Sequence, residues 1–133
     1  MYFFSSSTYY SARIIPKEVL INSTKIENKN SYKFTKAGIY SIKILSCDIS
    51  TDLSEIFLYN RELISIKFGK KFYNKNITST ARMFSGCSSL ISLDLSNLNP
   101  TNVENMLGMF RDCSSLTSLD LSNLNTQNVI YFE

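Results

Sequence analysis

Polar and apolar residues first alternate and then change to a longer spacing, and this change predicts two kinds of element. Residues 92–96 (SLDLS) alternate between polar and apolar side chains, which is typical of a strand with one buried face. Asn and Pro within residues 97–100 disfavour a longer strand and predict a turn. Thr101 and Glu104 then have the spacing of a helix capping box. Apolar residues follow at the i, i+3, i+4 and i+7 positions of a short helix, namely Val103, Met106, Leu107 and Phe110.

The same pattern is repeated along the chain. Residues 87–103 (CSSLISLDLSNLNPTNV) and 113–129 (CSSLTSLDLSNLNTQNV) are identical at 14 of 17 positions, with an offset of 26 residues. A repeat of this length is the signature of stacked units. Residues 51–133 are therefore expected to form about three rungs, the last one incomplete, of an α/β repeat: a short leucine-rich-repeat-like solenoid with one strand and one short helix per rung. In the most divergent copy, 27 residues upstream, Phe57, Leu63, Ile66 and Phe68 take the positions of Phe84, Leu90, Leu93 and Leu95.

Residues 1–50 do not share the repeat and predict a separate β segment. Residues 18–22 predict a strand, and residues 31–34 and 39–44 predict a hairpin that turns at residues 35–38. A repeat array exposes apolar surface at its ends, and a nonrepeating segment beside it can cover one of them. We therefore expect residues 1–50 to form an N-terminal β cap.

The repeat resembles that of a known family. The segments MFSGCSSLISLDLSNLNPTNV and MFRDCSSLTSLDLSNLNTQNV closely resemble the 26-residue repeat of BspA-like leucine-rich-repeat surface proteins of bacteria, mycoplasmas and some protists. The resemblance is clear over residues 77–133 and weaker back to about residue 50. It implies display at a cell surface and attachment to a protein or host-cell ligand. The chain differs from the family pattern in its few repeats and in having no evident signal or anchor.

Composition and charge narrow the classes of function. Residues 1–80 carry 12 Lys and Arg against 6 Asp and Glu, whereas residues 81–133 carry 2 against 5. The lysines are scattered among polar residues, which favours a solvated surface over a nucleic-acid site. The absence of histidine removes Ser-His and Cys-His nucleophilic machinery and most zinc chemistry. We expect a protein that is not an enzyme and holds no cofactor.

No apolar run approaches the roughly 20 residues of a membrane span. The first eight residues lack the basic region of a signal peptide, so we expect either that the protein is not secreted as it stands or that its true start lies upstream. The three cysteines, Cys47, Cys87 and Cys113, form no C-x-x-C pair. Cys87 and Cys113 hold equivalent positions, and we expect buried thiols there, because a helix-side spacing of about 10 Å would exceed the reach of a disulfide.

Outward residues of the predicted strands are the candidate site. Asp94 and Asp120 are expected about 4.8 Å apart on neighbouring strands. Paired carboxylates at this distance could also indicate a metal site or acid–base catalysis. Neither the glycine of a calcium loop nor a third ligand accompanies them, so we favour a polar binding surface over a metal site. Asn22 and Asn76 begin glycosylation sequons, which matter only in a eukaryotic secretory route. The candidate partner-binding residues are Lys67, Ser92, Asp94, Ser96, Ser118, Asp120 and Ser122.

The strand register predicts which side chains are buried. Leu93, Leu95, Leu119 and Leu121 should face the core, whereas Ser92, Asp94, Ser118 and Asp120 should face solvent. The third rung stops at its predicted helix, and an uncovered strand edge is a template for association. We expect the chain to be a fragment of a longer array or to self-associate through this C-terminal edge.

The sequence thus favours a noncatalytic protein-interaction or adhesion module of a cell-surface repeat protein. The alternative is an intracellular scaffold, or a truncated gene product without independent activity.

Overall fold

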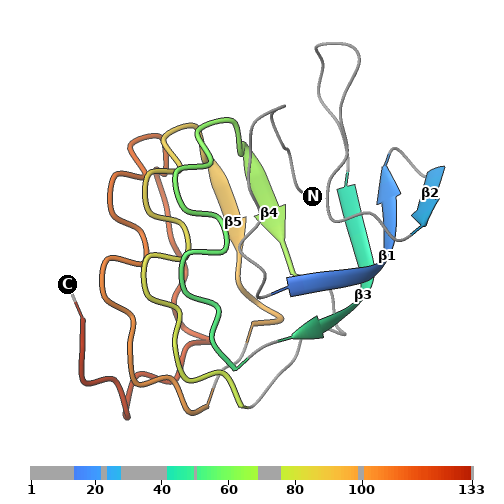
Figure 1. Ribbon diagram of the computed structural model, residues 1–133. Coiled ribbons are helices and arrows are strands. Elements are labelled where there is room, and N and C mark those ends of the chain that lie inside the picture. Colours follow the sequence, from blue (N-terminus) through green and yellow to red (C-terminus); the bar gives the residue numbers. More distant parts are fainter. Residues whose placement is uncertain are drawn as a thin grey trace.

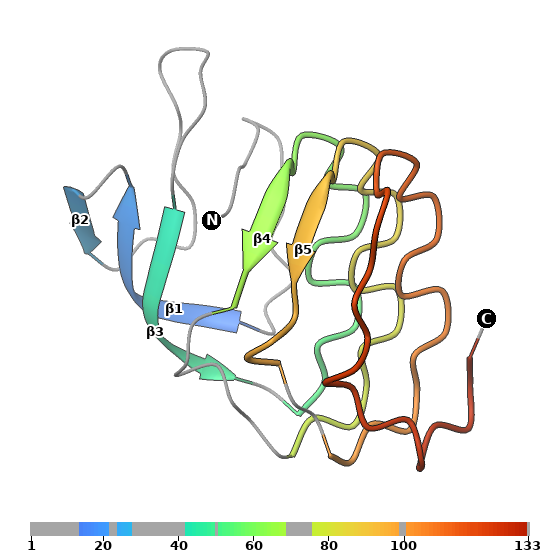
Figure 2. The ribbon, with the colours of Figure 1, turned by 180° about the vertical axis from the view of Figure 1, so that it is seen from behind.

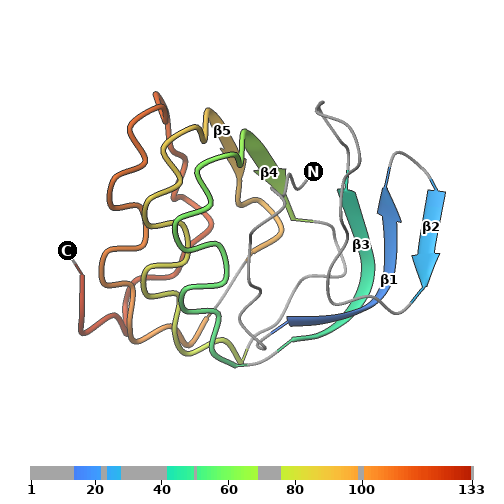
Figure 3. The ribbon, with the colours of Figure 1, turned by 45° about the horizontal axis from the view of Figure 1, so that its top comes forward.

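The computed structural model describes residues 14–21, 24–27, 42–49, 51–68, 76–98 and 101–132, and this part of the chain contains five strands and no helix. Strands β1 (Ile14–Ile21), β2 (Thr24–Glu27) and β3 (Ile42–Ile49) form an antiparallel sheet in the order β2-β1-β3. The sheet lies beside the start of the repeats, at the end away from the C-terminus (Figures 1 and 3).

The N-terminal strands agree in part with the pattern of the sequence. Most of the strand predicted at residues 18–22 lies in β1, and the strand predicted at residues 39–44 overlaps the start of β3. The other half of the predicted hairpin, residues 31–38, lies outside the described residues. The pairing of β1 with β3 is irregular between Pro16 and Val19, just after a proline whose missing N–H cannot donate to a strand ladder.

The repeats stack as rungs, which we define as residues 51–77, 78–103 and 104–129. Strand β4 (Ser65–Lys67) of the first rung pairs in parallel with β5 (Ser92–Asp94) of the second, with Ser65 opposite Ser92. This pairing confirms the offset of 27 read from the sequence. Figure 2 shows β4 and β5 side by side, with the chain of the third rung running beside β5. Residues 118–121 of the third rung, predicted to be a strand, are not one.

The predicted helix of each rung is wrong, and with it the α/β fold class. Residues 80–87 instead form overlapping turns, in which the N–H groups of Met83, Ser85 and Cys87 donate to the carbonyl three residues earlier at 3.0–3.1 Å. Arg82 (φ 52°) and Gly86 (φ 76°) have the positive φ that the third residue of a type II turn requires. The equivalent residues Glu55, Tyr59, Gly108 and Asp112 have positive φ as well.

Because the chain forms turns instead of a helix, many of its backbone hydrogen bonds join neighbouring rungs. The N–H groups of Arg82, Phe84 and Gly86 donate to carbonyls of the third rung at 2.8–2.9 Å. The N–H of Glu104, the end of the predicted capping box, donates to the carbonyl of Thr78 in the second rung at 2.9 Å. Each rung therefore depends on its neighbours for its main-chain partners, which an isolated helix would not.

A stack of phenylalanine rings runs through the core. Phe84 lies between Phe57 and Phe110, with ring centroids 5.4 and 5.9 Å apart and interplanar angles of 5°. Phe68 meets Phe84 edge to face at 6.4 Å. Aromatic contacts of this kind add to the free energy of burial. The rings therefore fix the turns of one rung directly over those of the next.

Burial follows the expected direction of the strand residues but weakens along the array. Leu95 is buried, whereas Leu93, Leu119 and Leu121 are only partly buried against the core. Exposed positions include Ser92, Ser118 and Asp120, as expected, and Asp94 is half-exposed. Leu124, in the turn of the third rung, is buried, so the third rung also contributes to the core.

Candidate partner-binding face

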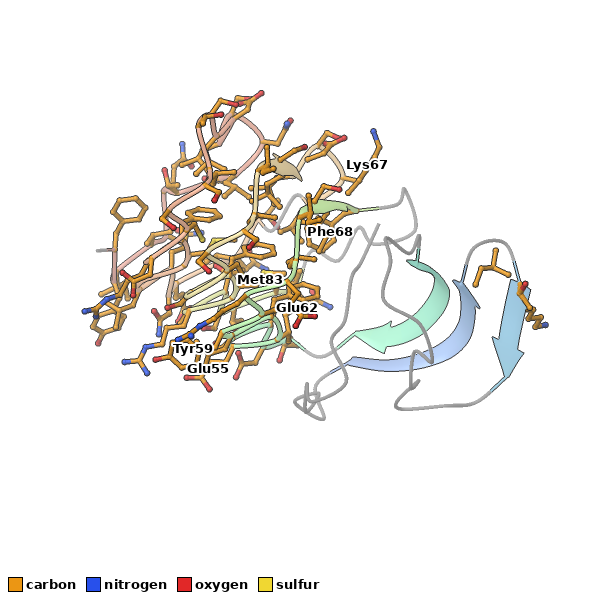
Figure 4. All side chains as sticks on the ribbon, turned by 90° about the horizontal axis from the view of Figure 1, so that it is seen from above. Glu55, Tyr59, Glu62, Lys67, Phe68 and Met83 are labelled. Carbon is orange, nitrogen blue, oxygen red and sulfur yellow. The ribbon has the colours of Figure 1, made fainter. Side chains whose placement is uncertain are left out.

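The outward side chains of β4 and β5, and the matching residues of the third rung, form one surface, which we call the strand face. Lys67 lies on the opposite side of the rungs from Glu55 and Tyr59 (Figure 4). The serines of this face, Ser92, Ser96, Ser118 and Ser122, are all exposed. The β4–β5 ladder places Lys67 opposite Asp94, so these two predicted site residues lie on the same side of the stack.

An ion pair joins two rungs on this face. The Nζ of Lys67 lies 2.6 Å from the Oδ2 of Asp94, because the two residues are opposite each other in the β4–β5 ladder. The Lys67 ammonium, followed by hydrogen bonds from Ser96, lowers the pKa of the Asp94 carboxyl well below its usual range. Asp94 is therefore a charged partner of Lys67 rather than a proton donor at neutral pH.

Both carboxylates also hold the turn that follows the strand position. The Oδ1 of Asp94 accepts a hydrogen bond from the N–H of Ser96, and the Oδ1 of Asp120 accepts one from Ser122, each at 2.9 Å. Hydrogen bonds from Ser122 also lower the pKa of Asp120. An Asx turn of this kind explains why aspartate recurs at this position without any catalytic demand. Within the described residues, no three His, Cys, Asp or Glu side chains are placed to hold a metal ion.

The two cysteines of the repeats form no disulfide, and their thiols are hydrogen-bonded to the backbone. The thiols of Cys87 and Cys113 each donate to the carbonyl of a phenylalanine in the preceding rung, Phe57 and Phe84, at 3.1 Å. Burial, as the largest effect, raises the pKa of Cys87 to about 12 and also raises that of Cys113. The expected reason for free thiols, a helix-side spacing, is wrong, because hydrogen-bonded rungs lie at about the spacing of strands.

A second exposed surface, which the sequence reasoning missed, lies on the turns and is called here the turn face. Arg82 reaches back to Glu55 of the preceding rung, with Nη1 and Oε1 3.6 Å apart. Arg111 and Asp112 are exposed farther along the array, and their Nε and Oδ2 atoms are 3.9 Å apart. Glu55 and Arg82 hold equivalent positions at the offset of 27, so opposite charges in the alignment are the signal that could have revealed this contact.

The two sequons differ in what the structure shows of them. Asn76 is exposed, and the Thr78 hydroxyl of its sequon donates to the carbonyl of Thr51 at 3.3 Å. Asn22 lies outside the described residues. In the turns of the rungs, amide side chains have structural roles: the Nδ2 of Asn97 donates to the carbonyl of Phe68 at 2.8 Å.

A family model described as "Mycoplasma protein of unknown function, DUF285" matches residues 51–133, which is the whole of the repeat region. No curated protein and no solved structure matches the chain. In the part of the chain that the structure describes, no helix is long and apolar enough to span a membrane.

Proposed function

The chain belongs to the DUF285 family of mycoplasma-type proteins, and on this premise we propose that it is a noncatalytic protein-interaction module displayed at a cell surface. The resemblance of the repeats to BspA-like surface proteins supports the location. The strand face supports the activity, because it offers an open row of hydroxyl and charged groups on successive rungs. A broad polar surface of this kind suits a protein or host-cell ligand more than a small molecule, which would need a concave pocket.

One observation carries the proposal: the carboxylates and thiols of these rungs, the groups that could take part in catalysis, are hydrogen-bonded to the backbone. Asp94 and Asp120 accept hydrogen bonds from turn N–H groups, and Cys87 and Cys113 donate to carbonyls. The serines beside them project into solvent from equivalent positions. These hydrogen bonds stabilise the rungs, and the exposed serines form a surface that several rungs share. Repeat arrays bind their partners through surfaces of this kind.

The test uses fluorescently labelled 133-residue protein and intact cultured host cells, with binding measured by flow cytometry. In the face variant, Ser92→Arg is combined with Ser118→Arg, which places bulky cations on the strand face without removing a side-chain hydrogen bond or ion pair of the described residues. The matched control combines Asn102→Arg with Gln127→Arg, because these side chains are exposed elsewhere on the array. Thermal unfolding of both variants checks that they fold like the wild-type protein.

We expect saturable binding of the wild-type protein and of the control, and at least a tenfold weaker binding of the face variant. Equal binding by the face variant would exclude the strand face, and no binding by any of the three would exclude host-cell attachment. Antibody labelling of intact cells that express the chain tests the location. Labelling only after permeabilisation would favour an intracellular scaffold instead.

A further inference from the structure

Tyr59 combines two features that are unfavourable for a tyrosine in a turn. Its φ is 56°, in the left-handed region that bulky side chains rarely adopt. The residue is also 65% exposed, so burial of its ring does not offset the cost of this conformation. Gly86 and Asp112 hold the equivalent position in the next two rungs, and both residue types suit a positive φ better. A residue that is strained and exposed at once indicates a role beyond stability.

The backbone of Gly86 supports one edge of the Tyr59 ring. A Cβ at Gly86 would overlap Cδ1 of the ring and come within 3.0 Å of Cε1, so any other residue there would displace the ring. The N–H of Tyr59 donates to the carbonyl of Ser85, next to Gly86, at 2.7 Å, which keeps the two positions together. The ring is therefore held on the turn face, where Glu55 lies beside it (Figure 4).

A pair of opposite charges lies on one side of the ring. Glu55 precedes Tyr59 by four residues, and the N–H of Leu58 closes the turn by donating to the carbonyl of Glu55 at 3.1 Å. Arg82 of the next rung lies beside Glu55, with Nη1 and Oε1 3.6 Å apart. This separation exceeds the roughly 3.2 Å of a hydrogen bond. The guanidinium therefore keeps donors, and the carboxylate keeps acceptors, for a ligand.

A second pair of charges lies on the other side of Gly86. The N–H of Gly86 donates to the carbonyl of Arg111 at 2.8 Å, which places Arg111 and Asp112 next to Gly86 in the third rung. The Nε of Arg111 and the Oδ2 of Asp112 are 3.9 Å apart, and both side chains are exposed. Among the described residues, neither side chain has a hydrogen bond. The ring thus has unused donors and acceptors on both sides.

The balance of charge favours an uncharged ligand. The two pairs carry two positive and two negative charges, and the exposed Arg61 and Glu62, close to Tyr59 in the chain, add one of each sign. A charged ligand would be attracted by one member of each pair and repelled by the other. A neutral ligand with hydroxyl groups accepts hydrogen bonds from the guanidinium groups and donates them to the carboxylates without this conflict.

The exposed ring narrows the ligand further. A pyranose sugar has C–H groups on one face and hydroxyl groups around its edge. The C–H face can pack on an aromatic ring, whose π face carries partial negative charge, while the hydroxyl groups reach the polar groups around that ring. A protein partner fits this surface less well, because the core of a protein interface is depleted of charged residues.

We propose that the turn face binds a neutral hexose at the end of a glycan, stacked on the ring of Tyr59 and hydrogen-bonded to the two charge pairs. One ring on an open surface binds a single sugar weakly, whereas several linked copies bind a glycan-coated surface much more tightly. The site lies on the opposite side of the rungs from Lys67 (Figure 4). Sugar binding here does not require the strand face and does not rest on the proposed function.

The test uses biotinylated 133-residue protein, held as a tetramer on fluorescent streptavidin, and an array of immobilised neutral, sialylated and sulfated oligosaccharides. We expect binding to neutral glycans that end in a hexose, no gain from sialic acid or sulfate, and competition by the free methyl glycoside of the terminal sugar. In NMR spectra of the monomeric protein, this methyl glycoside should shift the ring signals of Tyr59 and the amide of Gly86, but not the amide of Ser92.

Tyr59→Asn removes the ring and keeps the turn, because asparagine suits a positive φ. This variant should bind the glycans at least tenfold more weakly, as expected for the loss of an aromatic anchor, and thermal unfolding checks that it folds. Tyr59→Phe keeps the ring and should keep most of the binding. The matched control, Ile91→Asn, removes an apolar side chain that is 56% exposed and should bind like the wild-type protein.

Equal binding by Tyr59→Asn, binding to anionic glycans alone, or no binding to any neutral glycan would overturn the proposal. The variant that combines Ser92→Arg with Ser118→Arg should bind the array like the wild-type protein, so failure of the strand face and failure of this site are distinguishable. Loss of array binding in that variant would place the sugar on the strand face and contradict the proposal.

Intact host cells provide the comparison with a polypeptide partner. Periodate oxidation of the cell-surface sugars should reduce the part of the cell binding that Tyr59→Asn also removes. If that part survives periodate, the ring contacts a polypeptide instead, and the proposal is overturned.

Discussion

The ring of Tyr59 lies over the backbone of Gly86, its equivalent in the next rung. A Cβ built on Gly86 would overlap Cδ1 of Tyr59 and come within 3.3 Å of its Cα. Gly86 also has a φ of 76°, a conformation that side chains with a Cβ rarely adopt. Two independent causes, space and backbone conformation, therefore require glycine at this position.

We expect Gly86→Ala to lower the free energy of unfolding by about 2–4 kcal/mol, since the left-handed conformation costs about 1–2 kcal/mol and the steric overlap adds to it. Gly108→Ala is the matched control. It has a similar φ of 58°, but a Cβ there would meet its nearest neighbours at 3.7 and 3.8 Å. Gly108→Ala should therefore cost only about 1–2 kcal/mol. Urea unfolding followed by circular dichroism measures both.

The Tyr59→Ala background separates the two causes at Gly86. Without the ring, Gly86→Ala should cost about as much as Gly108→Ala does in the wild-type protein. An unchanged cost in that background would show that the ring is not the obstacle.

The alignment of the rungs could be predicted from the sequence, whereas the helices could not. The offset of 27 places Ser65 on Ser92, and the structure pairs these two residues. A run of tight turns returns the chain to the core every three or four residues, so apolar residues recur at the same spacing as on a helix. The contrary signal was Gly108 within the predicted helix, because glycine there is unfavourable in a helix and favourable at positive φ.

The candidate site shows a similar division. The alternation of polar and apolar residues in the sequence was enough to predict that Ser92 and Asp120 are exposed, although only Ser92 lies in a strand. The roles of the aspartates could not be predicted, because an Asx turn and an exposed binding carboxylate have the same sequence pattern. The charge pair of Glu55 and Arg82 was visible in the alignment only once the turns, rather than helices, were known to stack in register.

The position of a ring in the stack should determine how much its removal costs. Phe84→Ala should lower the free energy of unfolding by about 3–5 kcal/mol, the range for a buried phenylalanine. Phe110→Ala should cost about half as much, because Phe110 is partly exposed. Chemical denaturation of the two variants tests the order. A larger loss for Phe110→Ala would show that the third rung, not the second, is the centre of cooperativity.

The Lys67–Asp94 pair should contribute a small, pH-dependent stabilisation. The pKa of Asp94 is lowered from its ordinary value of 3.8, so its contribution is present above that pH and is lost as pH falls toward the folded-state value. Asp94→Asn keeps an oxygen for the N–H of Ser96 but loses the ion pair, and we expect a cost of about 0.2–1 kcal/mol at pH 7 because the pair is exposed.

Urea titrations at pH 7, 5 and 3 measure this difference, which should shrink between pH 5 and pH 3. Asp120→Asn is the control, since no described cation pairs with Asp120, and its effect should be smaller. A constant difference across the three pH values would show that the charge of Asp94 does not contribute.

The thiols of the repeat should be unreactive in the folded protein, and unequally so. The thiolate is the reactive form of cysteine, and the pKa of Cys87 is raised from 9.0 to about 12. At pH 8 its thiolate fraction is therefore about a thousandfold lower than in the unfolded chain. Cys113 is half-buried and should react faster than Cys87. Because the folded state keeps the thiol proton of Cys87, the free energy of unfolding should also fall as pH rises from about 9 toward 12. Timed alkylation at pH 8 with mass-spectrometric mapping, in native buffer and in urea, gives each rate separately. Equal rates for Cys87 in both conditions would mean that its thiol does not remain hydrogen-bonded to the carbonyl of Phe57.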